Sequence, residues 1–184
     1  NITLMFSMEH YEKVANAYIN GLKTYSVAGG DVASVASVAS FFISRVDVKL
    51  DEQFAEMGED DLKGKIGIAN AKLVYQRFKE LFSSEDWAYL AQQGAKVQRP
   101  LWASTSTKDP NYSDVLYVEN LIGSYTVNTL PPDTLDAFLE HGTVAETVEQ
   151  NLDAARQQMA RAEELGFDMN DVGEELQVEG VAKF

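Results

Sequence analysis

The most constraining feature of this sequence is a regular alternation of short apolar segments with longer amphipathic ones. The apolar segments predict four strands, at residues 2–6, 35–42, 100–104 and 126–129. The intervening segments carry apolar residues at helical spacing. Strands that alternate with helices form a parallel sheet with right-handed crossovers. We therefore expect an α/β fold, as part of either a doubly wound sheet or a (β/α)8 barrel.

Caps and apolar periodicity predict where the helices lie. We expect a helix after the cap Ser7, a short helix and an acidic loop at 45–57, a long helix at 65–82, a shorter one capped by Ser83 or Ser84, and further helices at 113–122, 131–141 and 170–181. The sequence Thr143-Val-Ala-Glu146 also matches a capping box. We expect it to open a helix that carries Val144, Val148 and Leu152 at helical spacing.

The first predicted strand is polar on one of its faces. Asn1 and Thr3 fall on one face and Ile2 and Leu4 on the other, because successive side chains alternate. A strand that is buried on both sides is normally apolar throughout, so a polar face favours a barrel interior. A barrel has eight strands and about 250 residues, and half of one exposes two strand edges. We therefore expect a single domain, 1–184, that is a partial barrel truncated at both ends.

Composition limits the class of protein and its partners. The chain has 184 residues, 45% hydrophobic content, no cysteine and a formal net charge of −14. This composition excludes intrinsic disorder, disulfides and thiol chemistry. No apolar run is long enough to span a membrane and no signal peptide is visible, which fits the cytoplasm. Residues 133–184 hold 13 acidic and three basic residues. Without a basic stripe we expect no nucleic-acid partner.

Two common kinds of site find no support in the residue pattern. His10 and His141 lack metal-ligand spacing with other histidines or carboxylates, so we expect them to be structural or exposed and expect no metal. No Gly-x-Gly-x-x-Gly or P-loop pattern occurs, so nucleotide binding is not expected. We accordingly expect no cofactor.

Five motifs, in order and with natural spacing, resemble the transaldolase family in its longer bacterial type. They are NITLMFS at 1–7, VASFFISRVD at 38–47, KGKIGIANAKLVYQRF at 63–78, RPLWASTSTKDP at 99–110 and TVNTLPPDTL at 126–135. The resemblance implies a (β/α)8 TIM barrel in which this chain forms strands five to eight, followed by extra C-terminal helices. It also places the site at the C-terminal ends of the strands.

The resemblance implies an enzyme that transfers a dihydroxyacetone unit from a ketose phosphate to an aldose phosphate. In the pentose phosphate pathway, sedoheptulose 7-phosphate and glyceraldehyde 3-phosphate become erythrose 4-phosphate and fructose 6-phosphate. The family uses a lysine Schiff base and no cofactor, and its lysine sits on the strand before the one that begins at Asn1. We therefore expect phosphorylated sugars as substrates and no turnover from residues 1–184 alone.

The resemblance also implies roles for individual residues near the reacting carbon. Asn1 resembles the asparagine that hydrogen-bonds substrate near the imine carbon, and Thr3 the threonine that helps hold a catalytic water. Ser40 resembles the serine that contacts substrate hydroxyls, and Phe42 the aromatic residue beside it. From the residues alone, the more common explanation of Asn1 and Thr3 is a polar strand end bonded to loop backbone.

Phosphate binding is implied for three further positions. Arg45 resembles the family's phosphate-binding arginine, and Ser104 falls on the serine of the seventh strand. Many transaldolases carry a second arginine just after that serine, whereas this chain has a Thr-Ser-Thr sequence and then Lys108. We assign Lys108 to that role in a shifted register. The ordinary alternatives are an ion pair of Arg45 with Asp47 or Asp51, and a solvated lysine at Lys108.

No lysine of the chain is a convincing imine-forming amine. Imine formation needs a neutral amine, and hence a desolvated lysine with a lowered pKa. Lys108 follows a run of hydroxyl residues in a wet loop, where its pKa stays near ~10.4. Lys72 falls in a helix, where we expect it to face solvent. Two other functions stay open: a non-catalytic sugar-phosphate binding domain, and another Schiff-base aldolase of the same barrel superfamily. The sequence predicts no oligomeric state.

Overall fold

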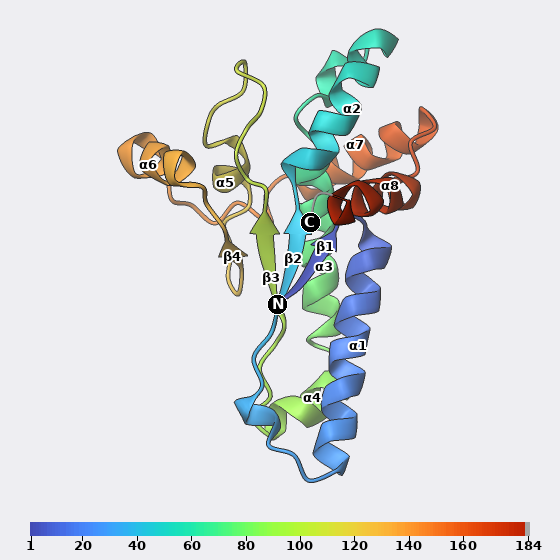
Figure 1. Ribbon diagram of the computed structural model, residues 1–184, viewed down its shortest axis with the longest axis vertical. Coiled ribbons are helices and arrows are strands. Elements are labelled where there is room, and N and C mark those ends of the chain that lie inside the picture. The colour runs from blue at the N-terminus through green and yellow to red at the C-terminus, as the bar shows by residue number, and fades with distance from the viewer. Residues whose placement is uncertain (183–184) are drawn as a thin grey trace.

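A four-stranded parallel sheet forms the centre of the computed structural model, which describes residues 1–182. The strands are β1 (Ile2–Met5), β2 (Val38–Phe42), β3 (Arg99–Ala103) and β4 (Val127–Asn128). They are hydrogen-bonded in the order β1-β2-β3-β4, and every neighbouring pair is parallel. The predicted α/β class and the parallel sheet are confirmed (Figure 1).

Helices connect and follow the strands, mostly where the sequence predicts them. They are α1 (Met8–Val27), α2 (Ser44–Met57), α3 (Ile66–Leu81), α4 (Glu85–Gln92), α5 (Leu116–Asn120), α6 (Pro132–His141), α7 (Leu152–Glu164) and α8 (Met169–Val181), with short 3-10 turns η1 (Val32–Ser34) and η2 (Asp60–Leu62). The predicted cap Ser7 accepts from the backbone N–H of His10, and Ser84 accepts from that of Trp87. Each cap satisfies a backbone donor that the first turn leaves unpaired.

One face of the sheet is covered by α1 and α3. Phe41 and Trp102 are fully buried on this face, with their rings edge to face and their centroids 6.4 Å apart. They pack with Tyr11 from α1 and with Val74 and Phe78 from α3 in the main hydrophobic core. Burial of each large side chain contributes about 1.5–3 kcal/mol to folding, so this core fixes the helices to the sheet.

A second core lies beyond the C-terminal ends of the strands, between α2, α7 and α8. Phe6, Val46, Phe54 and Leu176 are among its buried members. Helix α8 packs against α1, α2 and β1, and Figure 1 shows it crossing this end of the sheet. The buried His10 joins α8 to α1, because its Nε2 lies 3.0 Å from Glu174 while its Nδ1 accepts from the Phe6 N–H. His10 is therefore structural, as expected.

The opposite face of the sheet carries the alternate residues of β2 and β3. The register pairs Ser40 with Leu101 and Phe42 with Ala103. Successive side chains of a strand point to opposite faces. Ser40 and Phe42 therefore face away from the core that holds Phe41. We call this surface the open face of the sheet.

The helix predicted from the capping box is wrong over its first half. Helix α7 begins only at Leu152, and Val144 is exposed. The backbone N–H groups of Thr147 and Val148 both donate to the Ile122 carbonyl, and the Thr147 hydroxyl donates to the Glu119 carbonyl. The segment is thus held in an irregular conformation along α5. Tertiary hydrogen bonds and burial of Val148 override a local cap signal.

Three smaller expectations also change. The second strand begins at Val38 rather than at residue 35, since residues 35–37, which follow η1, form no regular structure. The short helix and loop predicted at 45–57 form one continuous helix, α2. Lys72 is 4% exposed rather than solvent-facing, because α7 covers that side of α3. Among residues 1–182, none of the helices is both long and apolar enough to span a bilayer.

Candidate functional site

The C-terminal edge of the sheet holds three of the six polar residues that the sequence singled out: Arg45, Ser104 and Lys108. Ligands of parallel α/β sheets bind at this edge, where the strands end and the loops converge. Ser104 follows β3, and its hydroxyl lies 2.9 Å from that of Ser44, the first residue of α2. The backbone N–H of Ser44 also donates to the Ser104 carbonyl at 3.1 Å. The ends of β2 and β3 are therefore joined by paired polar groups.

Asn1 and Ser40 meet on the open face of the sheet. The Ser40 hydroxyl donates to Asn1 Oδ1 at 2.8 Å, and Ser40 is almost fully buried. Alternation along β1 puts Thr3 on the same face as Asn1, and Thr3 is exposed there. The structure thus joins Asn1 and Ser40 across two neighbouring strands, with Thr3 on the same face of β1 as Asn1.

A bulge in β1 lies next to these residues. In the register, Ile2 lies beside Ala39 and Met5 lies beside Phe41, so β1 contains one residue more than β2 over this stretch. Leu4 takes a positive φ of 65° within it. Positive φ is uncommon for a residue with a branched side chain. The Gln177 amide from α8 donates to the Leu4 carbonyl at 2.9 Å, a contact that no sequence pattern predicts.

Arg45 stands at the C-terminal end of β2, in the first turn of α2. Its guanidinium carbon lies 5.3 Å from the centre of the Phe42 ring, within the range of a cation–π contact. Within residues 1–182 Arg45 forms no ion pair, so neither Asp47 nor Asp51 takes the role that the ordinary alternative gave them. Its charge is left available to an anion.

Lys108 lies in the loop that follows β3. It is exposed, and its Nζ donates to the hydroxyl of Ser106 at 2.6 Å. This loop begins at Ser104, which has a positive φ of 56°. No bond joins Lys108 to Arg45 among the residues that the structure describes.

Two aspartates of α2 form contacts that sequence reasoning missed. Asp47 is 1% exposed and accepts from the Gly67 N–H and from the Tyr117 hydroxyl, both at 2.8 Å. Burial raises the pKa of Asp47 to about 7, despite these hydrogen bonds. Asp51, one turn later, accepts from the Gly64 N–H at 3.0 Å and from the Tyr112 hydroxyl at 2.7 Å. Burial raises the pKa of the Asp51 carboxyl also.

Lys72 differs more from its predicted environment than Lys108 does. Its Nζ donates to the Gln150 carbonyl at 2.8 Å, and burial lowers the pKa of the amine. A lowered pKa suits imine chemistry. However, Lys72 lies on α3 beside α7, in the layer of helices rather than on the open face. Its position separates it from Asn1, Ser40 and Arg45.

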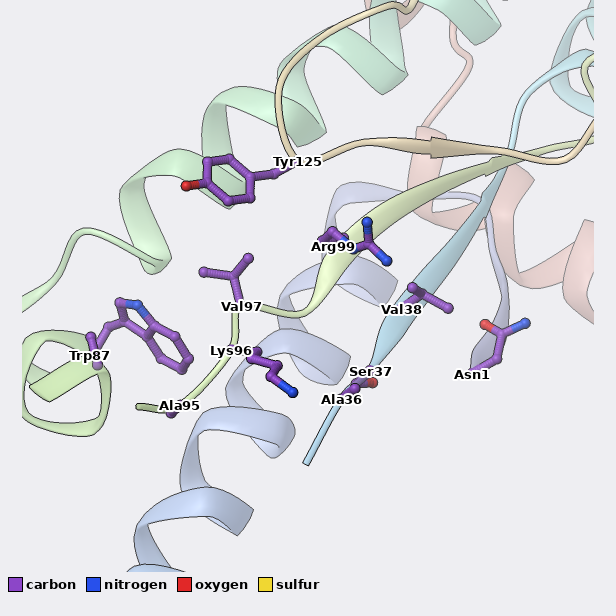
Figure 2. A pocket seen from close by; sticks show the side chains of 11 residues that line it. Asn1, Ala36, Ser37, Val38, Trp87, Ala95, Lys96, Val97, Arg99 and Tyr125 are labelled. Atoms are coloured by element: carbon purple, nitrogen blue, oxygen red, sulfur yellow. The ribbon is translucent and has the colours of Figure 1, made fainter. Parts of the chain in front are cut away.

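A large cavity lies at the other end of the sheet. It measures about 660 Å³ and is lined by the segments that lead into β2 and β3, by α4 and by Tyr125 (Figure 2). Trp87 and Val97 give it apolar walls, and Asn1 stands at its edge. The C-terminal edge, where Arg45 has no ion-pair partner among residues 1–182, has the chemistry of an anion site, so we take that edge as the candidate site.

Known proteins resemble this chain over its whole length. A sequence model of the family described as Transaldolase/Fructose-6-phosphate aldolase matches residues 1–184. A protein named Transaldolase from Parafrankia sp. is 50% identical over 188 aligned residues, covering 100% of this chain and 51% of the relative. Transaldolase 1 from Streptomyces avermitilis is 48% identical, covering 100% of this chain and 50% of the relative. Transaldolase 2 from Nostoc sp. is also 48% identical, covering 100% and 52%.

The similarities confirm the resemblance drawn from the five motifs. The chain spans about half the length of the curated relatives it matches. A match of this extent leaves no part of residues 1–184 outside the family's sequence pattern. The chain belongs to the transaldolase/fructose-6-phosphate aldolase family.

Proposed function

We propose that this chain is a single partial-barrel domain that supplies strands five to eight of a (β/α)8 transaldolase, with extra C-terminal helices. The open face of the sheet is then the barrel interior, and the remaining strands close it. The enzyme transfers a dihydroxyacetone unit from a ketose phosphate to an aldose phosphate. Sedoheptulose 7-phosphate and glyceraldehyde 3-phosphate yield erythrose 4-phosphate and fructose 6-phosphate.

The amine that starts the reaction is contributed by residues that precede Asn1 in this proposal. It attacks the ketose carbonyl and forms an imine with loss of water. The imine holds the dihydroxyacetone unit after the carbon–carbon bond breaks, until an aldose phosphate accepts it. Among residues 1–182, Lys72 is in the helical layer and Lys108 is exposed, so neither presents a desolvated amine to the open face.

Asn1, Thr3 and Ser40 surround the reacting carbon in this assignment. They are polar but uncharged, so they orient substrate hydroxyls and water without stabilising the protonated form of a nearby amine. Asn1 hydrogen-bonds the substrate beside the imine carbon, Thr3 helps hold the catalytic water, and Ser40 contacts substrate hydroxyls. Phe42 provides an apolar wall next to Ser40.

Arg45, Ser104 and Lys108 bind the phosphate that every substrate of this reaction carries. The guanidinium of Arg45 offers a planar pair of donors that matches a phosphate, and Lys108 adds a flexible point charge. The observation that carries the proposal is Arg45 at the C-terminal edge of the sheet, which has no ion-pair partner among residues 1–182 and follows Ser44, the hydrogen-bond partner of Ser104.

A two-substrate assay tests the proposal. The protein as its gene encodes it should form erythrose 4-phosphate and fructose 6-phosphate only when both ketose phosphate and aldose phosphate are present. Purified residues 1–184 alone should show no turnover, because they lack the imine-forming amine. Turnover by residues 1–184, or absence of transfer by the whole protein, would contradict the proposal.

Direct aldol cleavage is the second candidate, since the matching family description names fructose-6-phosphate aldolase beside transaldolase. An aldolase would release free dihydroxyacetone from fructose 6-phosphate without any acceptor. Product analysis with and without glyceraldehyde 3-phosphate therefore separates the two. A non-catalytic sugar-phosphate binding domain would bind phosphate but give neither set of products.

A further inference from the structure

The loop that follows β3, together with α5 at its end, is bonded to α2 at three positions. Nearest the sheet, Ser104 meets Ser44 at 2.9 Å. Further along α2, the Tyr117 hydroxyl donates to Asp47, and one turn later the Tyr112 hydroxyl donates to Asp51. Figure 1 shows the long excursion between β3 and α5 rising beside α2.

The two tyrosine–aspartate contacts repeat the same local arrangement. Each carboxylate accepts one tyrosine hydroxyl and one glycine N–H, from Gly67 at Asp47 and from Gly64 at Asp51. The aspartates are four residues apart, so they project from the same side of α2. The arrangement therefore ties three segments together: α2, the start of α3, and the loop after β3.

The glycines are required by close approach. A Cβ at Gly67 would lie 2.6 Å from the Ile43 carbonyl oxygen, and a Cβ at Gly64 would lie 2.9 Å from the Tyr112 ring. Gly64 also has a φ of 68°, which side chains disfavour. The start of α3 can thus reach both carboxylates only because these two positions lack side chains.

This network joins the two segments that carry the cations assigned to phosphate. Arg45 is in the first turn of α2, next to Asp47, and Lys108 is in the loop that Tyr112 and Tyr117 anchor. Lys108 itself bonds only to Ser106 within the described residues. Its position relative to Arg45 therefore depends on how the loop is attached on either side, at Thr105 to Asn128 and Thr129 and at Tyr112 to α2.

We propose that Asp47, Asp51, Tyr112 and Tyr117 are positioning residues that hold the Lys108 loop in register with Arg45 and so complete the phosphate site. This inference rests on the proposed function in one respect, the assignment of phosphate to Arg45 and Lys108. The four residues do not contact the substrate; they set the separation of the groups that do.

Removal of the two tyrosine hydroxyls tests the inference in the whole protein as its gene encodes it. Tyr112→Phe and Tyr117→Phe keep the rings in place and delete only the bonds to Asp51 and Asp47. We expect each to raise the KM for glyceraldehyde 3-phosphate between about two- and tenfold, the equivalent of one hydrogen bond. The kcat with unphosphorylated glyceraldehyde as acceptor should stay unchanged, because that substrate makes no use of the phosphate site.

Tyr75→Phe is the matched control. Tyr75 is almost fully buried, and its hydroxyl donates to the Ser124 carbonyl at 2.9 Å, away from the loop after β3. It therefore loses a comparable hydrogen bond and should leave both acceptors unaffected. Equal effects of Tyr75→Phe and the two loop variants, or a parallel loss with both acceptors, would show a purely structural role and overturn the inference.

Titration with inorganic phosphate separates this inference from the proposed function. If the protein catalyses no transfer, the proposed function fails, but binding of phosphate can still be compared by calorimetry. Weaker binding by Tyr112→Phe and Tyr117→Phe than by Tyr75→Phe supports the positioning role. Equal binding by all three variants, or no binding by the unsubstituted protein, overturns it.

Discussion

The two faces of the sheet differ although they are built from the same strands. Phe41 and Phe42 are neighbours in β2, yet Phe41 is 0% exposed among α1 and α3 while Phe42 is half-buried beside Arg45. The covered face is apolar from Ala39 to Trp102, whereas the open face carries Ser40 hydrogen-bonded to Asn1. In this protein stability is concentrated on one face and candidate chemistry on the other.

This contrast explains the unusual polarity of the first strand. A parallel strand with helices on both faces is apolar throughout. Here α1 and α3 cover one face of β1 and β2, and α8 packs against the end of β1. The amide and hydroxyl groups of Asn1 and Ser40 lie on the face away from α1 and α3. Because those groups are already paired across strands, they are fixed in place before any substrate arrives, which favours binding and catalysis.

The largest expected effect is the difference in stability between alanine variants of Phe41 and Phe42. Phe41→Ala should lower the free energy of unfolding by about 3–5 kcal/mol, the usual cost of deleting a fully buried ring. Phe42→Ala should cost less stability, because its site is half-buried, and should instead raise KM for phosphorylated sugars. Chemical denaturation and steady-state kinetics on both variants measure the contrast. Equal losses of stability would show that the faces are not distinct.

Arg45 gives the next largest effect, and Arg99 is its matched control. Arg45→Met removes the charge but keeps an apolar stem, and it should lower kcat/KM for phosphorylated acceptors about 10- to 100-fold, the range for hydrogen bonds to a charged group. Arg99 is exposed at the N-terminal end of β3 and lines the large cavity there. Arg99→Met should change kcat/KM by less than about twofold.

The reverse outcome would contradict the assignment of the phosphate site to the C-terminal edge of the sheet. If Arg99→Met impaired the reaction and Arg45→Met did not, substrate phosphate would bind at the N-terminal end of the sheet. The 660 Å³ cavity would then be the functional one.

The smallest expected effect is the contribution of Asp47 to the pH dependence of the free energy of unfolding. Its folded-state pKa, about 7, lies above its ordinary value of 3.8. Between these values the folded carboxyl retains a proton that the unfolded one releases, so stability falls as pH rises. Asp51 and the hydroxyl of Tyr117 are the titratable groups that face it. Asp47→Asn cannot ionise and should therefore gain about 1–2 kcal/mol relative to the unsubstituted protein between pH 5.5 and 7.

Denaturation midpoints of both proteins across this pH window provide the measurement. A constant difference between Asp47→Asn and the unsubstituted protein would show that the Asp47 carboxyl titrates normally in the folded state.

The sequence predicts the covered face well and the site incompletely. Apolar periodicity identifies α1, α3 and the strands, because burial against one sheet face imposes that periodicity. The capping box at Thr143 misleads, because Thr147 and Val148 bond to Ile122, a contact that no local pattern reveals. Lys72 is likewise misjudged, since only the docking of α7 buries it.

Some of the site residues can likewise be predicted from the sequence, and others cannot. The family motifs supply Arg45 and Ser40, and alternation groups Asn1 with Thr3. The bonds of Tyr112 and Tyr117 to α2 span about 60–70 residues, and sequence spacing alone carries no signal for them. The only local sequence feature related to these bonds is the pair of glycines Gly64 and Gly67. Their role becomes clear only from the close contacts that the structure shows at these two positions.

The most direct test of the central claim is to trap the imine. The whole protein, incubated with fructose 6-phosphate and reduced with borohydride, should carry one sugar adduct, and peptide mapping should place it on a lysine that precedes Asn1. An adduct on Lys72 or Lys108 would contradict the account, because the reacting amine would then lie within these residues and away from the open face.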